Sequence, residues 1–263
     1  MQAIWITDEI FARLLPKDVY ARQLMQYPVK PDVHSNSHVL FRKVFFLKEK
    51  NGKYLLHISA DDYYKLYING RFVCMGPAPG YPFHYYYNET DISQYLVSGK
   101  NTIAVHTYYQ GLTNRVWISG DGRHGLWMEL LADGKKVLVS DESFSVRRHS
   151  GYDTHGEIYG WITQFPEDYD SRSAEDGFFA VNFDDSSWHR AVAVKSPDYT
   201  LFAQPTSVLS CYPLLPVLIE KKEGRLVFAD FGREFVGTLR VTAKGRAGTR
   251  ITVRQGEELN ADG

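Results

Sequence analysis

Short apolar or alternating runs begin at Val39 and continue along most of the chain. In the run 63–68, Tyr64, Leu66 and Ile68 share one face, while the residues between them share the other. Turn-forming clusters such as Asn69-Gly70 separate the runs, and Asn-Gly is a strong signal for a two-residue hairpin because both turn positions need a positive φ. Many short strands without long helices between them predict an antiparallel β-sandwich or barrel rather than a parallel α/β sheet. The strands expected from this pattern span residues 39–47, 53–60, 63–68, 101–109 and 126–132.

The regions outside this strand series have different patterns. Residues 8–26 are the one stretch with helical periodicity, with Asp8 as the expected N-cap, and they form part of a helical or irregular lead-in over 1–38. Residues 148–200 are polar and loop-rich, so we expect them to have a function or to pack along the surface.

Prolines at 205, 213 and 216 mark a linker, after which a second strand series begins. Its expected strands are 225–231, 236–243 and 249–255. We therefore predict a sandwich domain over residues 1–205, followed over 206–263 by a linker and the first strands of a second, incomplete β-sandwich.

Composition narrows the classes of function. The chain has 263 residues, with 44% hydrophobic, 23% charged and a net charge of −1, so no basic stripe is available for nucleic acid. Its two cysteines are far apart, no signal peptide is visible, and no apolar run reaches the length of a membrane span. A cytoplasmic protein with no membrane and no nucleic-acid partner is expected, and the alternative is a secreted protein whose signal peptide has been removed. Aromatic residues reach 14%, which suits the faces of sugar rings but is also common in β-sandwiches.

Several motifs, in order along the chain, resemble the N-terminal β-sandwich region of bacterial α-L-rhamnosidases of glycoside hydrolase family 78. The resemblance covers roughly residues 39–263 and implies a jelly-roll, galactose-binding-like sandwich followed by a second sandwich. The motifs are Ser59-Ala60-Asp61 with Leu66-Tyr67-Ile68-Asn69-Gly70, Gly76-Pro77, Gly99-Lys100-Asn101-Thr102-Ile103-Ala104-Val105, Phe183-Asp184-Asp185-Ser186-Ser187-Trp188, Asp230-Phe231-Gly232 and the segment 256–263.

The sequence offers no acid pair for glycoside hydrolysis. The resemblance places the catalytic acids in an (α/α)₆ barrel that follows the sandwiches, and no residues here match that barrel. Glu257 and Glu258 are adjacent, so on a strand they point to opposite faces and cannot flank one bond. His34 and His38 lie four residues apart but outside any helical pattern, which argues against a metal pair. No catalytic residue is therefore assigned, and the chain alone should be inactive.

The loops that follow the strand 101–109 are the predicted carbohydrate-binding surface, because they mix aromatic rings with polar side chains at a sandwich end. The resemblance implies calcium-dependent rhamnose binding near this position in some relatives, but Gln110-Gly111 replaces the expected Gly-Asn-Gly-Trp stretch, so no cofactor is assigned. Ca²⁺ at Asp61-Asp62 or Asp184-Asp185 remains the alternative to solvated turns. The predicted sugar-binding residues are Tyr108, Tyr109, Gln110, Asn114, Trp117, Asp121 and Arg123.

These features predict the non-catalytic N-terminal region of an α-L-rhamnosidase-like enzyme that releases terminal rhamnose. The expected partners are a rhamnose-containing glycan and the catalytic domain of the same polypeptide. The alternatives are a stand-alone lectin-like module, a complete hydrolase, and the equivalent region of another glycosidase such as a β-galactosidase-like enzyme. For the predicted loops, the alternative to sugar binding is an interface with the catalytic domain.

Overall fold

The alternating runs of the sequence become the long central strands of the structure. A computed structural model of the chain describes residues 1–17, 31–112, 121–154, 156–159, 164–222, 224 and 226–256. Every strand predicted before residue 133 is present within a few residues of its expected bounds. Three short 3₁₀ helices accompany the strands: η1 (Glu9–Phe11), η2 (Ser93–Tyr95) and η3 (Ser171–Ser173).

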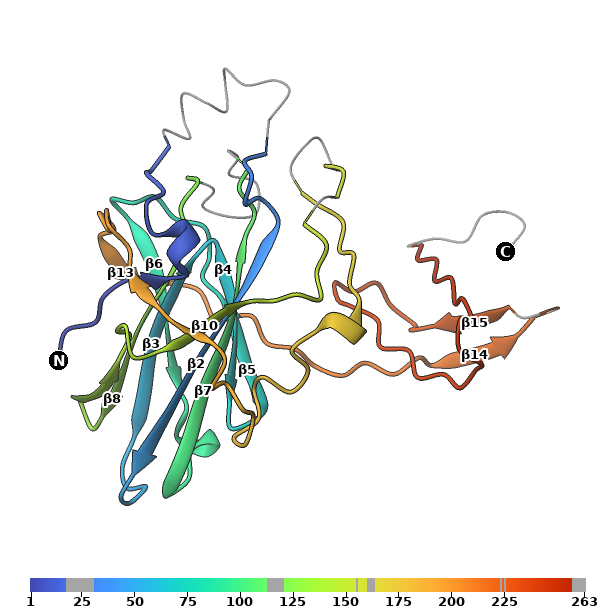
Figure 1. Cartoon of the computed structure of the whole chain (residues 1–263). Helices are drawn as coiled ribbons and strands as arrows, with labels where there is room; N and C mark the ends of the chain where they lie inside the picture. Colours follow the sequence, from blue (N-terminus) through green and yellow to red (C-terminus); the bar gives the residue numbers. More distant parts are fainter. Residues whose placement is uncertain are drawn as a thin grey trace. The chain divides into compact units, whose positions relative to one another are not determined.

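The strands of the described residues form three sheets (Figure 1). A seven-stranded sheet has the order β12-β1-β8-β3-β6-β13, with β9 paired to β8; a six-stranded sheet has the order β11-β10-β2-β7-β4-β5; and β14 pairs with β15. All pairings are antiparallel except β13 with β6. The bounds are β1 (Ile6–Thr7), β2 (Ser37–Leu47), β3 (Tyr54–Asp61), β4 (Tyr63–Ile68), β5 (Arg71–Gly76), β6 (Tyr85–Asp91), β7 (Gly99–Tyr109), β8 (Gly125–Ala132), β9 (Lys135–Val139), β10 (Ser145–Arg148), β11 (His189–Arg190), β12 (Val192–Ala193), β13 (Leu201–Ala203), β14 (Leu218–Lys221) and β15 (Val227–Asp230).

The main hydrophobic core lies between the two large sheets, which makes the fold a β-sandwich. Leu56, Ile58 and Met128 come from the seven-stranded sheet, and Val105 and Leu66 come from the six-stranded sheet. All five side chains are fully buried. Because side chains alternate along a strand, the residues between them point away from this core. On β4, Tyr64 and Leu66 are buried while Tyr63, Lys65 and Tyr67 are partly exposed.

The predicted hairpin at Asn69-Gly70 connects β4 to β5. Asn69 has a φ of 49° and Gly70 a φ of 84°, so both central residues adopt the positive values that this turn requires. The Asn69 side chain also fixes the turn, since its amide nitrogen donates to the Tyr95 carbonyl at 2.9 Å and its oxygen accepts from the Thr102 N–H at 2.8 Å.

The polar segment after β10 packs over the outer face of the six-stranded sheet. This agrees with the expectation that residues 148–200 pack along the surface. Phe178 and Trp188 of this segment form a second cluster with Leu40 of β2 and Ala104 of β7. Arg42, fully buried on the same face, donates from Nε to the Phe178 carbonyl and from one terminal nitrogen to the Ala180 carbonyl, both at 2.6 Å. This arginine therefore fastens the segment to the sheet.

The helix predicted over 8–26 is wrong for the part that the structure describes. Asp8 does cap a helix, accepting a hydrogen bond from the Ile10 N–H, but the helix is the single 3₁₀ turn η1. Residues 13–17 are not helical, and residues 18–26 lie outside the described residues. Pro16 lacks an N–H and clashes with the preceding turn, so it disfavours continuation of a helix through this point.

The chain divides into two compact units, Met1–Ser210 and Cys211–Gly263. In the second unit, the strand predicted over 225–231 corresponds to β15. The strands predicted over 236–243 and 249–255 are wrong for this structure, since residues 236–256 contain no strand. Alternation shows which face of a strand would be buried, but a strand also needs a hydrogen-bonded neighbour.

Candidate functional site

The predicted sugar-binding residues that the structure describes are buried at one end of the sandwich. Tyr108 and Tyr109 end β7, Gln110 follows them, and Asp121 and Arg123 precede β8. None of the five has more than 9% of its surface exposed. Asn114 and Trp117 lie outside the described residues.

The β7 residues bond to other parts of the protein. The Tyr108 hydroxyl donates to the Asn36 side chain at 2.9 Å, and the Tyr109 hydroxyl donates to the Asp32 carboxylate. Burial and, for Tyr109, the neighbouring Asp32 raise the pKa of both phenols. The Gln110 N–H donates to the Asp62 carboxylate at 2.7 Å.

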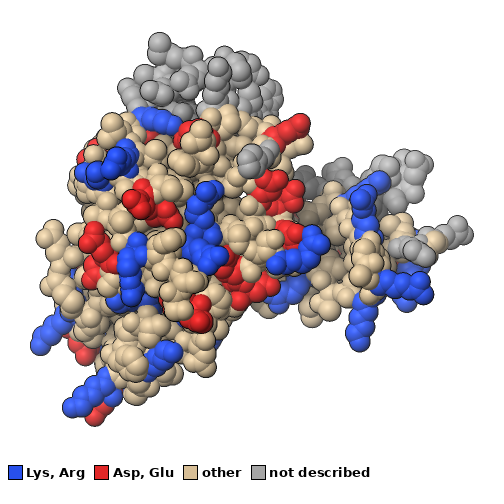
Figure 2. All heavy atoms as spheres, viewed as in Figure 1, with Lys and Arg blue, Asp and Glu red and all other residues tan. Residues whose placement is uncertain are grey.

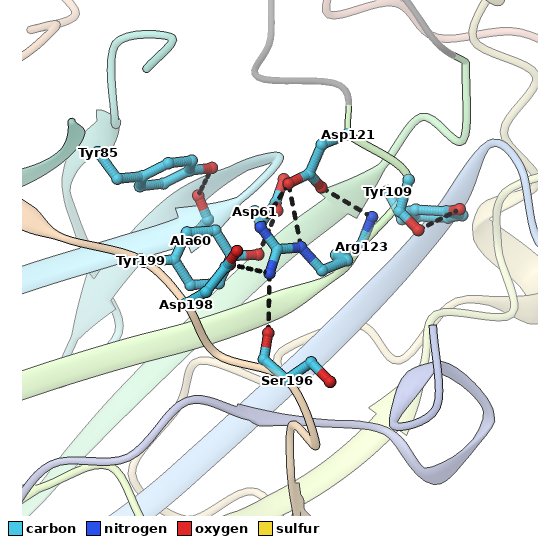
Figure 3. A network of polar contacts seen from close by, with 10 residues as sticks. Ala60, Asp61, Tyr85, Tyr109, Asp121, Arg123, Ser196, Asp198 and Tyr199 are labelled. Carbon is cyan, nitrogen blue, oxygen red and sulfur yellow. Dashed lines mark hydrogen bonds and ion pairs between the residues drawn. The ribbon is translucent and has the colours of Figure 1, made fainter. Parts of the chain in front are cut away.

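Arg123 lies at the centre of a polar network (Figure 3). Its Nε and one terminal nitrogen donate to Asp121 at 3.0 and 2.5 Å, and the other donates to the Ser196 carbonyl at 2.8 Å and to Asp198 at 2.5 Å. The guanidinium carbon also lies 4.1 Å from the centre of the Tyr199 ring. Burial opposes the charge, but the hydrogen bonds that Arg123 donates to the carboxylates of Asp121 and Asp198 raise the pKa of Arg123 overall.

The same network contains a fully buried carboxyl group at the end of β3, on Asp61. Tyr199 donates its hydroxyl to Asp61 Oδ2 at 2.6 Å, while Asp61 Oδ1 has no hydrogen-bond partner among the described residues. Burial raises the pKa of Asp61 well above its ordinary value, and the nearby charges of Asp121 and Asp62 act in the same direction. The protonated, uncharged form is therefore favoured here more than in water.

Residues on both sides of the segment 113–120 are hydrogen-bonded within the protein. On one side, the Gly111 carbonyl accepts from Ser35 at 3.3 Å; on the other, Asp121 is bound to Arg123. In this structure, the described members of the predicted set serve to hold these ends in place. Sugar binding by the complete set stays a prediction.

A second feature, which we call the outer-sheet pocket, lies on the outer face of the six-stranded sheet. Its cavity volume is about 170 Å³. The sheet contributes its floor and the segment after β10 its walls. The lining residues are Lys65, Tyr67, His106, His149, Tyr152, Tyr169, Glu175, Asp176, Gly177, Phe178 and Phe179.

Three histidines gather beside this pocket. His38 of β2 and His106 of β7 approach to 2.9 Å between Nδ1 and Nε2, so one ring nitrogen donates to the other. Tyr152 stacks on His38 with ring centroids 3.6 Å apart. Burial lowers the pKa of His38 to about 3 and that of His106 well below its ordinary value; it also lowers the pKa of His149. The three imidazoles are therefore neutral at neutral pH.

Each of the two units of the chain matches a known protein family. Residues 50–210 match the family described as the α-L-rhamnosidase N-terminal domain. The chain belongs to this family. Residues 219–263 match the bacterial α-L-rhamnosidase concanavalin-like domain, so the two matches follow one another in the order that the motifs predict.

The curated relatives of this rhamnosidase N-terminal region are much longer proteins. An α-L-rhamnosidase of Streptomyces avermitilis is 30% identical in an alignment of 221 positions that covers 79% of this chain and 21% of the relative. One of Formosa agariphila is 25% identical over 262 residues, covering 93% of this chain and 27% of the relative. The chain thus spans about a fifth to a quarter of the length of these relatives.

A solved structure shares the fold of this rhamnosidase N-terminal region. The family 78 rhamnosidase of Bacillus sp. GL1 aligns with a TM-score of 0.69 and 26% identity, covering 84% of this chain and 21% of that one. Among weaker matches, the α-L-rhamnosidase of Dictyoglomus aligns with a TM-score of 0.59 and 23% identity. The alignment covers 89% of this chain and 26% of that one, and it shows a common fold.

The motifs that carried the resemblance have structural roles in the rhamnosidase N-terminal region. Asp185, in the Phe-Asp-Asp-Ser-Ser-Trp motif, lies 3.2 Å from the buried Arg42, and Trp188 packs beside Leu40. Asp184 accepts a hydrogen bond from the Ser186 N–H, which forms a local turn. Within the described residues, no group of three or more His, Cys, Asp or Glu side chains is placed to hold a metal ion.

Sequence reasoning missed the outer-sheet pocket. The alternation of Tyr63, Lys65 and Tyr67 showed that these residues face away from the core, but it did not show which segment would cover them. Acidic and basic side chains are interspersed over the face of the molecule in Figure 2. The described residues contain no helix long and apolar enough to cross a membrane.

Proposed function

We propose that the chain is an ancillary region of an α-L-rhamnosidase that supports the enzyme and contacts carbohydrate without performing hydrolysis itself. The observation that carries this proposal is the pair of consecutive family matches, first to the N-terminal domain and then to the concanavalin-like domain. The curated relatives that the chain matches are named α-L-rhamnosidases, so the whole protein is proposed to release terminal rhamnose from glycans or glycosides.

The carbohydrate-contacting surface is proposed at the sandwich end formed by residues 108–124. The buried ion pair of Arg123 with Asp121 and the bond from Tyr109 to Asp32 support this proposal, because they hold the flanks of the loop rigidly. A binding loop on a rigid base loses less conformational entropy when its ligand arrives. Trp117 is the residue proposed to stack on the sugar.

Two assays on the purified chain test these proposals. An aryl α-L-rhamnoside should not be hydrolysed above the rate in buffer, and turnover that disappears when one carboxylate of this chain is replaced would contradict a non-catalytic role. In calorimetry, L-rhamnose should bind with a Kd in the millimolar range, and Trp117→Ala should abolish the heat that comes from binding at the 108–124 surface. Binding that is unchanged in Trp117→Ala would show that the loop is not the binding surface, and absence of binding would favour a domain interface there.

A further inference from the structure

The outer-sheet pocket has aromatic walls that are separate from the proposed loop surface. Tyr152 and Tyr169 lie with ring centroids 4.7 Å apart, and His149 meets Tyr152 edge-on at 4.9 Å. Elsewhere in the lining, Tyr67 of the sheet and Phe179 stack with ring centroids 5.1 Å apart. Flat apolar faces that carry polar edges suit the C–H faces of a sugar ring.

His149 supplies a hydrogen-bond donor whose position the backbone fixes. The Gly151 N–H donates to His149 Nδ1 at 3.2 Å, while Glu175 Oε2 lies 3.5 Å from the same nitrogen. Because the contact with the Gly151 N–H is the shorter one, we assign Nδ1 as the acceptor. Burial lowers the pKa of His149, which keeps the ring neutral. A neutral imidazole whose Nδ1 accepts carries its proton on Nε2, and His149 therefore has an N–H available for a ligand.

Lys65 adds a cation that has no hydrogen bond or ion pair to any of the described residues. Its ammonium is close enough to help lower the pKa of His38, His106 and His149. Lys65 faces outward on β4, directly opposite His106 in the strand register. An ammonium in a pocket that bonds to none of the described residues can donate to the hydroxyl or ether oxygens of a ligand.

The acceptors of the pocket are the carboxylates of Glu175 and Asp176. Glu175, whose side chain is 9% exposed, lies 2.9 Å from Arg147 and accepts from the Ser150 hydroxyl at 3.0 Å. Asp176 accepts from the Tyr169 hydroxyl at 3.4 Å. Two carboxylates in the lining disfavour an anionic ligand, while one lysine and several neutral donors disfavour a simple cation.

These observations together describe a site for an uncharged, hydroxyl-rich ring. We propose that the outer-sheet pocket binds one neutral pyranose residue of a glycan, with the ring between the aromatic walls and its hydroxyls bonded to Lys65, His149 and the carboxylates. The volume of about 170 Å³ is below the roughly 300–1,000 Å³ of pockets that enclose drug-sized ligands, which limits the ligand to one ring. This site goes beyond the proposed function, because it involves none of the residues assigned to the 108–124 surface.

The site is tested by saturation-transfer NMR and calorimetry of the whole chain with three probes: methyl α-L-rhamnopyranoside, methyl β-D-galactopyranoside and methyl α-D-glucopyranoside. At least one probe should bind with a Kd in the millimolar range. Lys65→Met, which keeps most of the side-chain stem, and Tyr169→Ala, which removes a residue 40% exposed, should each weaken that binding about tenfold.

Matched controls are Lys100→Met at the far end of β7 and Tyr212→Ala, whose side chain is 84% exposed in the second unit; neither should change the affinity. Trp117→Ala distinguishes binding at the outer-sheet pocket from binding at the 108–124 surface, because it should leave the Lys65-dependent binding unchanged. If Tyr169→Ala lowers the melting temperature, its loss of binding could come from unfolding, and the test then rests on the affinity of Lys65→Met alone. The proposal is overturned if no probe binds at up to about 50 mM, or if binding is unchanged in Lys65→Met. Binding that is lost only in Trp117→Ala overturns it as well.

Discussion

The guanidinium of Arg42 lies 3.2 Å from the carboxylate of Asp185, although 143 positions separate the two residues in the chain. The arginine side chain is completely buried and that of Asp185 is 24% exposed. Because Arg42 also bonds two main-chain carbonyls of the covering segment, this one side chain connects β2 to the walls of the outer-sheet pocket.

We therefore expect Arg42→Met to lower the free energy of unfolding by about 3 kcal/mol, since it leaves buried carbonyls and a carboxylate without their partner. Asp185→Asn should cost about 1 kcal/mol, because solvent screens its partly exposed carboxylate. Urea denaturation measures both. Lys43→Met on the same strand is the control and should cost less than about 1 kcal/mol. Equal losses in Arg42→Met and Lys43→Met would contradict the anchoring role.

The second prediction concerns the buried carboxyl of Asp61. Its pKa is raised in the folded protein, so folding is favoured at low pH by its protonation, and this contribution is lost as the pH rises above the unfolded value of 3.8 toward the folded one. Asp61→Asn keeps the acceptor for Tyr199 and removes the charge. The stability of the native sequence relative to Asp61→Asn should fall as the pH rises from 4 to 8, measured by urea midpoints. A constant difference across this range would show that Asp61 does not titrate abnormally.

A third prediction follows from the neutral histidines. The pKa of His38 falls from 6.5 to about 3, with burial as the main cause and the charges of His149 and Lys65 as further causes. The unfolded chain takes up a proton below pH 6.5 while the folded chain does not, so stability is present above 6.5 and is lost as the pH falls toward 3. The double variant His38→Gln/His106→Gln should show a shallower loss of stability between pH 7 and pH 4. An unchanged slope would mean that these rings are protonated in the native protein.

The turn between β4 and β5 gives a fourth prediction. Asn69→Ala places a residue with a Cβ and no polar group at a φ of 49° and removes the bonds to the Tyr95 carbonyl and the Thr102 N–H. We expect a loss of about 2 kcal/mol in unfolding free energy. Asn51→Ala, in an exposed turn, should change stability by less than about 0.5 kcal/mol. If thermal or urea unfolding shows similar effects for both, the Asn69 side chain does not stabilise the hairpin.

The fifth prediction concerns the second unit. Many of its apolar side chains are exposed, including Val217, Ile219, Val241 and Ile251. Few buried contacts mean a low free energy of local opening, so this unit should exchange amide hydrogens fastest and limited proteolysis should cut first within 205–224. Equal protection of residues 226–256 and the first sandwich in a monomeric sample would contradict this expectation.

The strand positions and the Asn69-Gly70 turn could be predicted from the sequence because they depend on local chemistry. Alternation along β4 reports which side chains face the core, and Asn-Gly is one of the few pairs that accept two positive φ values. The family resemblance was accessible for a similar reason, since its motifs form turns and anchors within short stretches of chain.

The buried state of the predicted sugar-binding residues and the existence of the outer-sheet pocket were decided only by the tertiary structure. In the sequence, Arg123 looks like an exposed loop residue and Tyr109 like the end of a strand at the binding surface, but their partners Ser196 and Asp32 lie more than 70 positions away. The pocket likewise needs the register that places Lys65 opposite His106, and a covering segment held by Arg42. Periodicity describes one strand and its own two faces, whereas a site made between distant segments depends on which buried polar groups find partners in the folded chain.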